Sequence, residues 1–324
     1  MEKRKLGNSG LETFPFALGG NVFGWTIDEK TSFKILDAFT GAGFNLVDTA
    51  NVYSMWKEGN KGGESETIIG NWFRQNSGNR SKVIIATKVG GDMGSGKSLK
   101  KAYILKEVEQ SLKRLQTDYI DLYQSHWDDV STPVAETLEA YAQLIKEGKV
   151  RAIGASNFSK ERLKEALKAS FEKSLPRYET LQPRYNLYDR EEYEKQYQQL
   201  CVENNLGVLP YYGLASGFLS GKYRSKNDLS KSARGGGVEK YLTPKGFAIL
   251  NALDKIAARY HVQQATISLA WLKDRPGVTA PIASATSTLQ LKELIKAVEI
   301  KLNEDSLKLL DEASKIELMP AEHH

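Results

Sequence analysis

The chain alternates between short, β-rich apolar runs and longer segments with helical periodicity, and this alternation constrains its fold more than any other feature. Strands are expected at residues 16–20, 44–48, 82–88, 119–126, 151–157, 179–183, 207–212 and 278–283. The helices that follow them are expected at residues 31–41, 65–75, 99–115, 133–147, 159–169, 190–204, 245–274 and 289–298. Eight strands that each lead into a helix predict an α/β fold, the closed parallel (β/α)8 or TIM barrel.

Two segments stand outside this alternation. Residues 3–16 contain two short extended pieces around a Gly-Asn-Ser-Gly turn, which predicts an N-terminal β-hairpin. Residues 213–243 form a long loop after the seventh strand, and loops of that length usually bind or cover something. A disordered surface loop is the alternative for the distal half of this segment. No linker divides the chain, so we expect one domain over residues 1–318 and a tail over 319–324. One interpretation of His323 and His324 is the start of a purification tag.

Charge and cysteine content exclude several classes of function. The chain has 45 basic and 40 acidic residues, a mixture too even to indicate nucleic-acid binding. Its one cysteine, Cys201, cannot form an internal disulfide. No apolar run approaches the roughly 18 residues of a membrane span, and the N-terminus lacks the apolar core of a signal peptide. We therefore expect a cytoplasmic protein with neither nucleic acid nor membrane as a partner.

Four titratable side chains lie at the carboxyl ends of three successive predicted strands. Asp48 ends the second strand and Tyr53 follows it by five residues, while Lys88 and His126 end the third and fourth. The carboxyl ends of the strands are where a parallel barrel builds its active site. Each residue taken singly also has a structural explanation, such as a helix cap for Asp48 or packing for Tyr53. Their coincidence on consecutive strand ends favours chemistry.

The four residue types fit reduction of a carbonyl better than hydrolysis. A tyrosine, whose pKa is ordinarily near 10, is a competent general acid if a cation eases the loss of its proton. Lys88 can supply that cation, and Asp48 can hold the ammonium group in place. His126 can donate a hydrogen bond to the oxygen that becomes negative as hydride arrives. The pattern therefore predicts a proton donor, Tyr53, with an oxyanion-stabilising neighbour.

The segments around these residues resemble the aldo-keto reductase family. GFNLVDTANVYS and GGESETIIG are similar to the family's signature around the catalytic Asp and Tyr, VIIATKV to the segment of the Lys, and DYIDLYQSHWDD to that of the His. The resemblance runs from the hairpin to the last barrel helix. It implies a small-molecule aldehyde or ketone as substrate, NADP as the coenzyme, and catalytic roles for Asp48, Tyr53, Lys88 and His126.

The same resemblance implies a binding site for the coenzyme. GKVRAIGASNF is similar to the segment whose Ser and Asn, here Ser156 and Asn157, hold the nicotinamide carboxamide, and Gln182 matches a third such position. In GVLPYYGLASGFLSGKYR, Tyr211 aligns with the aromatic residue that stacks on the nicotinamide, with Tyr212 as the alternative. The residues that would then line the pyrophosphate are Gly213, Leu214, Ser216, Gly217, Leu219 and Lys222.

The adenosine end departs from the family's pattern. Many members carry Lys-Ser and Arg near the 2′-phosphate, where this chain has Ser284, Thr286, Ser287 and Gln290. Glu293 matches a Glu that binds the adenine amino group in the family. Gln290 cannot form the bidentate fork that an Arg would form, but Lys222 or Arg224 of the long loop can supply charge. We expect NADPH to be preferred, with NAD also compatible with the site.

Three tryptophans follow strands and are expected near the mouth of the barrel, where they would line a substrate pocket: Trp25, Trp56 and Trp127. Aromatic walls suit apolar carbonyl compounds, and they also stack on the faces of sugars. The His, Cys and carboxylate residues show no metal-ligand spacing, so we expect no metal.

Two alternative functions remain open from the sequence. Residues 91–98, GDMGSGKS, match the phosphate loop G-x-x-x-x-G-K-[ST] of nucleotide triphosphatases, and they lie between a predicted strand and helix. That interpretation leaves Tyr53, His126 and Gln182 unexplained. A non-catalytic, coenzyme-binding regulatory subunit built on the same barrel would have a similar site, and only measured turnover separates it from an enzyme.

Overall fold

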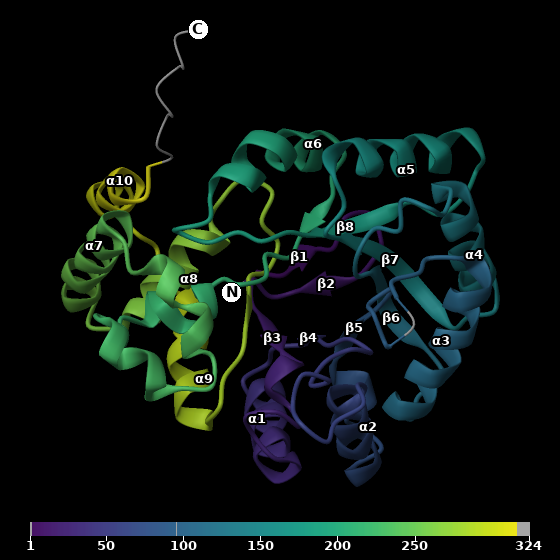
Figure 1. Ribbon diagram of the computed structural model, residues 1–324, viewed down its shortest axis with the longest axis horizontal. Coiled ribbons are helices and arrows are strands. Elements are labelled where there is room, and N and C mark those ends of the chain that lie inside the picture. The colour runs from purple at the N-terminus through teal and green to yellow at the C-terminus, as the bar shows by residue number, and fades with distance from the viewer. Residues whose placement is uncertain (1, 95, 316–324) are drawn as a thin grey trace, which may run out of the picture.

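The computed structural model describes residues 2–94 and 96–315, and in them eight parallel strands form one curved sheet enclosed by helices (Figure 1). The strands neighbour one another in the order β10-β3-β4-β5-β6-β7-β8-β9. The N–H groups of Thr279 and Ile282 donate to the carbonyls of Val208 and Pro210 at 2.8 and 2.9 Å, which joins the two outer strands. The predicted (β/α)8 barrel is confirmed. The expected tail, 319–324, lies outside the described residues.

The strands are short at the two ends of the sheet and longer in its middle. Their bounds are β3 Ala17–Gly19, β4 Leu46–Asp48, β5 Ile84–Val89, β6 Ile120–Ser125, β7 Val150–Ser156, β8 Tyr178–Gln182, β9 Gly207–Val208 and β10 Ile282–Ala283. Nearly all of their side chains are buried, because the barrel interior lies on one side of the sheet and helices cover the other. The carboxyl ends of these strands carry the candidate site.

The helices pack around the outside of the sheet, as Figure 1 shows for α1 to α6. Several begin at a side chain that accepts a hydrogen bond from a free backbone N–H of the first turn, as Asp28, Ser159 and Asn303 do. The bounds are α1 Glu29–Gly41, α2 Glu64–Gln75, α3 Lys101–Leu115, α4 Val134–Lys146, α5 Lys160–Glu172, α6 Gln198–Glu203, α7 Pro244–Tyr260, α8 Gln264–Lys273, α9 Thr288–Ile295 and α10 Glu304–Ala313.

Three helical predictions differ from the structure. The single helix expected at 245–274 is two helices, α7 and α8, because His261 adopts a left-handed φ of 53° and ends α7. The helix expected at 190–204 contains a π-helical turn, η3 Tyr193–Tyr197, before α6. Helix α10 was not predicted. No Gly or Pro marks the break at His261, so the local sequence gives little warning of it.

The predicted N-terminal hairpin is confirmed by antiparallel strands β1 Arg4–Lys5 and β2 Glu12–Thr13. Leu6 and Leu11 belong to the apolar cluster inside the barrel. The Arg4 guanidinium donates to the carbonyls of Lys273 and Val278 at 2.5 and 3.0 Å. Because the hairpin turn lies against Gly207, at the start of β9, it covers the amino-terminal end of the barrel and leaves the carboxyl end open.

The long loop after β9 is folded into four short turns: η4 Ala215–Ser220, η5 Lys226–Lys231, η6 Gly235–Gly237 and η7 Glu239–Tyr241. Tyr223, Val238 and Tyr241 anchor it with fully or almost fully buried side chains. The distal half therefore packs onto the barrel, and the alternative of a disordered loop is wrong. Among the described residues, no helix combines the length and the apolar composition that crossing a membrane requires.

Two helical glycines differ in the space around them, which gives a matched test of helix packing. A Cβ added at Gly70 in α2 would collide with the backbone of Arg114 and Leu115 in α3, whereas one added at Gly41 in α1 would meet nothing within 4 Å. We expect Gly70→Ala to lower the free energy of unfolding by about 1–3 kcal/mol. Gly41→Ala should change it by less than about 1 kcal/mol. Urea unfolding measures both, and equal effects would contradict the close α2–α3 contact.

Candidate active site

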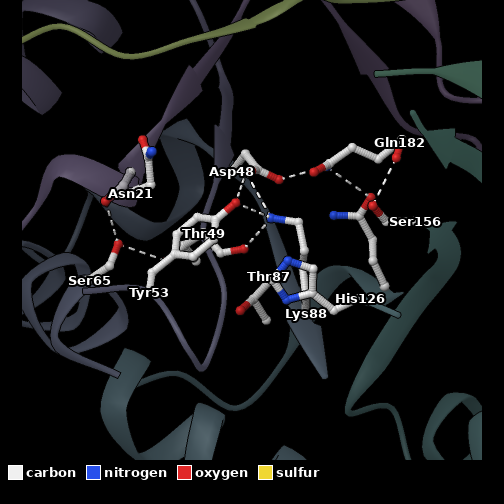
Figure 2. A network of polar contacts seen from close by, with 12 residues as sticks. Asn21, Asp48, Thr49, Tyr53, Ser65, Thr87, Lys88, His126, Ser156 and Gln182 are labelled. Carbon is white, nitrogen blue, oxygen red and sulfur yellow. Dashed lines mark hydrogen bonds and ion pairs between the residues drawn. The ribbon is translucent and has the colours of Figure 1, made fainter. Parts of the chain in front are cut away.

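The four side chains expected to form the active site meet at the carboxyl end of the barrel (Figure 2). Asp48 is the last residue of β4, and Tyr53 lies in the loop that follows it. Lys88 is in β5, and His126 follows β6. The parallel register pairs Asp48 with Ala86 and Lys88 with Gln124. Lys88 lies two residues beyond Ala86 and His126 two residues beyond Gln124, so all three side chains point to the same face of the sheet.

The Lys88 ammonium group has a partner for each of its three N–H bonds. Its Nζ lies 2.8 Å from Asp48 Oδ2, 2.8 Å from the carbonyl oxygen of Thr49 and 2.7 Å from the Tyr53 hydroxyl oxygen. Tyr53 donates to the same Asp48 oxygen at 3.1 Å, and Gln182 donates to the other one at 2.8 Å. Lys88 and Asp48 are almost completely buried. The ion pair is therefore fully hydrogen-bonded, as a buried pair must be to persist.

Burial and neighbouring charge set the protonation of Tyr53 and Lys88. Burial first, and then Asp48, raises the pKa of Tyr53 well above its usual value. Burial lowers the pKa of Lys88, while Asp48 and the more distant Glu66 oppose that change. The phenol thus keeps its proton near neutral pH. An ammonium group 2.7 Å away stabilises the phenolate as the proton leaves.

His126 is buried as an uncharged imidazole. Burial, followed by the charges of Lys88 and Lys97, holds the pKa of His126 well below its usual value. Its ring stacks on Trp127 at 3.7 Å and lies 6.0 Å from the ring of Tyr53. The Nδ1 atom is buried and has no hydrogen-bond partner among the described residues. A neutral imidazole keeps one N–H donor, so it can bind an oxygen without bringing a charge.

The residues expected to bind the coenzyme's carboxamide form a connected network next to this group. Asn157 donates to the carbonyl of His126 at 2.8 Å, and Ser156 donates to the carbonyl of Gln182 at 2.8 Å. Tyr211 donates to Asn157 Oδ1 at 2.8 Å. Tyr212, in contrast, is 47% exposed, and its ring lies 5.3 Å from the ring of Tyr211. The geometry therefore links Tyr211, and not Tyr212, to the predicted carboxamide site.

Asp48, Tyr53, His126 and the residues of the amide network open onto a cavity of about 760 Å³, whereas Lys88 does not line it. Most of the predicted coenzyme residues line it, namely Ser156, Asn157, Gln182, Tyr211, Gly213, Leu214, Ser216, Gly217, Lys222, Ser284, Gln290 and Glu293. Trp56 and Trp127 line it as well, while Trp25 packs edge-to-face against Trp56 at 5.4 Å. Two of the three expected indoles, Trp56 and Trp127, therefore line the cavity, and Trp25 packs against Trp56.

Four predicted coenzyme residues do not line the cavity. Leu219 is fully buried in the core. Arg224 forms an ion pair with Asp254 at 2.7 Å. Ser287 accepts a hydrogen bond from the Gln290 N–H and so begins α9, and Thr286 donates to the Gln290 side chain. These side chains are engaged in holding the local fold.

Three polar residues that the sequence did not single out line the same cavity: Asn21, Arg184 and Arg234. The Arg234 guanidinium lies 3.4 Å from Asn21 Oδ1 and 5.4 Å from the Trp25 ring. In residues 2–94 and 96–315 it forms no ion pair. Arg234 comes from η6 and its neighbours Asn21 and Trp25 follow β3, so only the fold brings them together.

The segment that matches a phosphate loop has a different local structure. The Asp92 carboxylate accepts hydrogen bonds from the N–H groups of Gly94 and Gly96 at 2.8 and 2.9 Å. In a phosphate loop such N–H groups must be free to bind phosphate. Helix α3 begins only at Lys101, and Lys97 lies over the Trp127 ring at 5.2 Å. The match to that motif is therefore one of sequence alone.

Comparisons with known proteins identify the family. A model of the Aldo/keto reductase family matches residues 15–315. The uncharacterized oxidoreductase YrpG of Bacillus subtilis (strain 168) is 36% identical over 321 residues, covering 96% of this chain and 95% of that protein. Aldo-keto reductase YhdN of the same organism is 35% identical and covers 95% of this chain and 92% of its own length. A probable voltage-gated potassium channel subunit beta of Arabidopsis thaliana is 32% identical, covering 93% of this chain and 92% of that protein.

The chain belongs to the aldo-keto reductase family. Its members are oxidoreductases that use nicotinamide coenzymes, and the predicted class of enzyme is thereby confirmed.

Burial of an uncharged His126 should make the protein less stable as the pH falls below about 6.5. The fold keeps the pKa of His126 well below its usual value, mainly through burial, whereas the unfolded chain binds a proton near pH 6.5. Between these two pKa values only the unfolded state is protonated. The free energy of unfolding should therefore fall by up to about 1.4 kcal/mol per pH unit.

His126→Gln should remove that pH dependence, since glutamine does not titrate. His261→Asn is the matched control: it replaces an exposed histidine with a residue that tolerates the left-handed backbone, and the pH dependence should remain. Urea unfolding at about pH 7.5 and about pH 5.5 measures the difference. An unchanged difference in His126→Gln would show that other groups cause it.

Proposed function

We propose that the protein catalyses the reversible, NADPH-dependent reduction of an aldehyde or ketone to the alcohol. The observation that carries this proposal is the Lys88 ammonium group 2.7 Å from the Tyr53 hydroxyl, at the floor of an open cavity. When bound, the nicotinamide of the coenzyme supplies the hydride. Tyr53 supplies the proton to the carbonyl oxygen, as a general acid.

The three neighbours of Tyr53 have separate roles in this proposal. Lys88 lowers the cost of forming the phenolate because its positive charge is held at hydrogen-bonding distance. Asp48 fixes the Lys88 ammonium group and accepts the Tyr53 hydrogen bond in the resting site. His126 donates from its uncharged imidazole to the substrate oxygen and stabilises the developing negative charge. Each of these groups is held in place before substrate arrives.

The residues around the cavity fit a dinucleotide. Ser156, Asn157 and Gln182 offer amide and hydroxyl groups to the carboxamide, and Tyr211 offers its ring to the nicotinamide. Gly217 has a left-handed φ of 95°, and a Cβ there would lie 3.7 Å from Lys222 Nζ. Because Gly217 has no side chain, a pyrophosphate can approach its backbone closely, next to the Lys222 ammonium group. In this proposal Arg234, whose guanidinium forms no ion pair among the described residues, supplies a second positive charge.

A second candidate function is a coenzyme-binding subunit without catalytic activity. The relative of Arabidopsis thaliana named as a probable channel subunit favours it. The complete set of Asp48, Tyr53, Lys88 and His126 in hydrogen-bonding or ring contact favours the enzyme instead. Turnover of a carbonyl compound distinguishes the two.

The substrate is a small carbonyl compound that binds between aromatic side chains. Tyr53, Trp56 and Trp127 line the cavity, and Trp56 is 51% exposed. Such a surface suits apolar aldehydes and ketones, and also the faces of sugars. A panel of aldehydes, ketones and aldoses, followed by the loss of reduced-coenzyme absorbance, tests this class directly.

Removing the proposed proton donor should abolish most turnover and leave coenzyme binding intact. We expect Tyr53→Phe to reduce kcat by on the order of a hundredfold or more. Lys88→Met should reduce it similarly, because it removes the charge that stabilises the phenolate. Tyr103→Phe is the control, since the Tyr103 hydroxyl is buried, lies outside the cavity and has no hydrogen-bond partner in the described part of the chain. Unchanged turnover in Tyr53→Phe would rule out the mechanism.

The preference for NADPH rests on donors at the adenosine end of the cavity. Gln290 accepts the N–H and hydroxyl of Thr286 through its side-chain oxygen, at 2.8 Å each, and this turns its NH2 group outward as a donor. Lys222 adds a positive charge on the loop. Arg224, held by Asp254, contributes nothing in this proposal. One charge-assisted hydrogen bond contributes roughly 1.5–3 kcal/mol to the binding free energy, before the entropic cost of ordering the groups that form it is subtracted.

We therefore expect NADPH to bind about tenfold more tightly than NADH. Titration of tryptophan fluorescence with each coenzyme measures the ratio. Gln290→Arg should tighten NADPH by on the order of tenfold without changing NADH, because an Arg forms a bidentate pair with phosphate. Arg224→Gln should leave both dissociation constants unchanged. Equal affinities in the wild type, or tighter NADH, would contradict the expected preference.

A further inference from the structure

We propose that Arg184 makes the site bind oxidised coenzyme more weakly than reduced coenzyme, and so favours reduction of the carbonyl over oxidation of the alcohol. This inference rests on the proposed function, in which Tyr211 stacks on the nicotinamide. It concerns a residue that is neither in the catalytic group nor among the carboxamide ligands.

Arg184 is held beside the proposed nicotinamide position by the end of β8. It lies two residues after Gln182, and its backbone pairs in parallel with that of Tyr211. The guanidinium lies 5.3 Å from the Tyr212 ring, and Arg184 lines the main cavity. It also lines a hollow of about 240 Å³ that reaches Asn157 and Tyr211. The positive charge thus lies beside Tyr212, and Arg184 lines the same hollow as Tyr211, the residue expected to carry the nicotinamide.

The pKa of Tyr211 also indicates that the charge of Arg184 lies close to the Tyr211 hydroxyl group. Burial raises the pKa of Tyr211, and the positive charge of Arg184 opposes that rise. Tyr211 is in turn bonded to Asn157, at 2.8 Å. Arg184 therefore acts on the same hydroxyl group that connects Tyr211 to the carboxamide site.

The charge of Arg184 is not neutralised by an ion pair within the described part of the chain. Its Nε is buried and has no hydrogen-bond partner there. Asp189, whose charge acts on it, is engaged with Asn186 at 2.9 Å and with Tyr241 at 2.9 Å. Glu192 reaches the smaller hollow but is exposed. Lys88, by contrast, is paired with Asp48 at 2.8 Å.

A positive charge that forms no ion pair within the described residues distinguishes the two redox states of the coenzyme at this place. Transfer of hydride to the carbonyl carbon converts an uncharged dihydronicotinamide ring into a cationic nicotinamide ring, and the carbonyl becomes an alcohol after taking the proton of Tyr53. Like charges in a partly buried site repel more strongly than in water. Arg184 should therefore weaken binding of the oxidised form and leave the reduced form almost unaffected.

The test compares dissociation constants of NADPH and NADP⁺ for the wild type, Arg184→Gln and Arg184→Lys by calorimetry at low salt. We expect Arg184→Gln to tighten NADP⁺ relative to NADPH by roughly threefold to tenfold, the size expected of one partly screened charge. Arg184→Lys keeps the charge and should keep most of the wild-type ratio. The ratio in the wild type should also decrease as salt is added.

An Arg184→Gln ratio equal to that of the wild type would overturn the inference and leave the proposed function intact. A change of the same size in Arg184→Lys would also overturn it, because the effect would then come from shape and not from charge. If the wild type binds neither coenzyme, the proposed function itself is wrong, and this inference is wrong with it. Should Arg184→Gln fail to fold, the salt dependence of the wild-type ratio decides alone.

Discussion

The buried ion pair between Lys88 and Asp48 is the interaction on which the rest of the site depends. Burying two charges costs several kcal/mol per ion, and one pair contact does not offset that cost unless the remaining donors and acceptors are also satisfied. Here Tyr53 and Gln182 complete the set. Because these groups come from β4, β5, β8 and the loop after β4, the pair is satisfied only when the barrel is closed. The catalytic geometry and the fold therefore require each other.

A second buried pair lies behind the first, on the other face of β5. Thr87 points away from the barrel interior and donates to Glu66 at 2.5 Å, and Arg114 pairs with the same carboxylate at 2.7 Å. Neighbouring residues of a strand face opposite sides, so Lys88 and Thr87 join the catalytic group to the layer between sheet and helices. These contacts fix the helix-facing side of β5. The strand in turn holds the Lys88 ammonium group in position, as electrostatic preorganisation requires.

Much of the barrel and the catalytic group could be predicted from the sequence, because both are encoded locally. Asp48 and Lys88 each end an apolar run, and an apolar run that ends in a polar residue marks a strand end without knowledge of its partners. The break at His261 was missed, since it arises from a left-handed residue that no Gly announces. Arg184 and Arg234 were missed for a different reason. Their role depends on which distant residues they face, and only strand pairing and loop packing decide that.

The packing of the long loop explains how Arg234 is held next to the distant residue Asn21. Arg234 reaches the cavity from a segment whose buried anchors are Tyr223 and Val238, and it meets Asn21 beyond β3. Ordering this loop costs conformational entropy in any case, but the burial of its aromatic and aliphatic side chains offsets that cost during folding. Under the proposed function, a coenzyme phosphate bound there would meet a guanidinium already in place, so less ordering would remain to be done on binding. The loop would then contribute to coenzyme affinity through its packing against the core as much as through its charge.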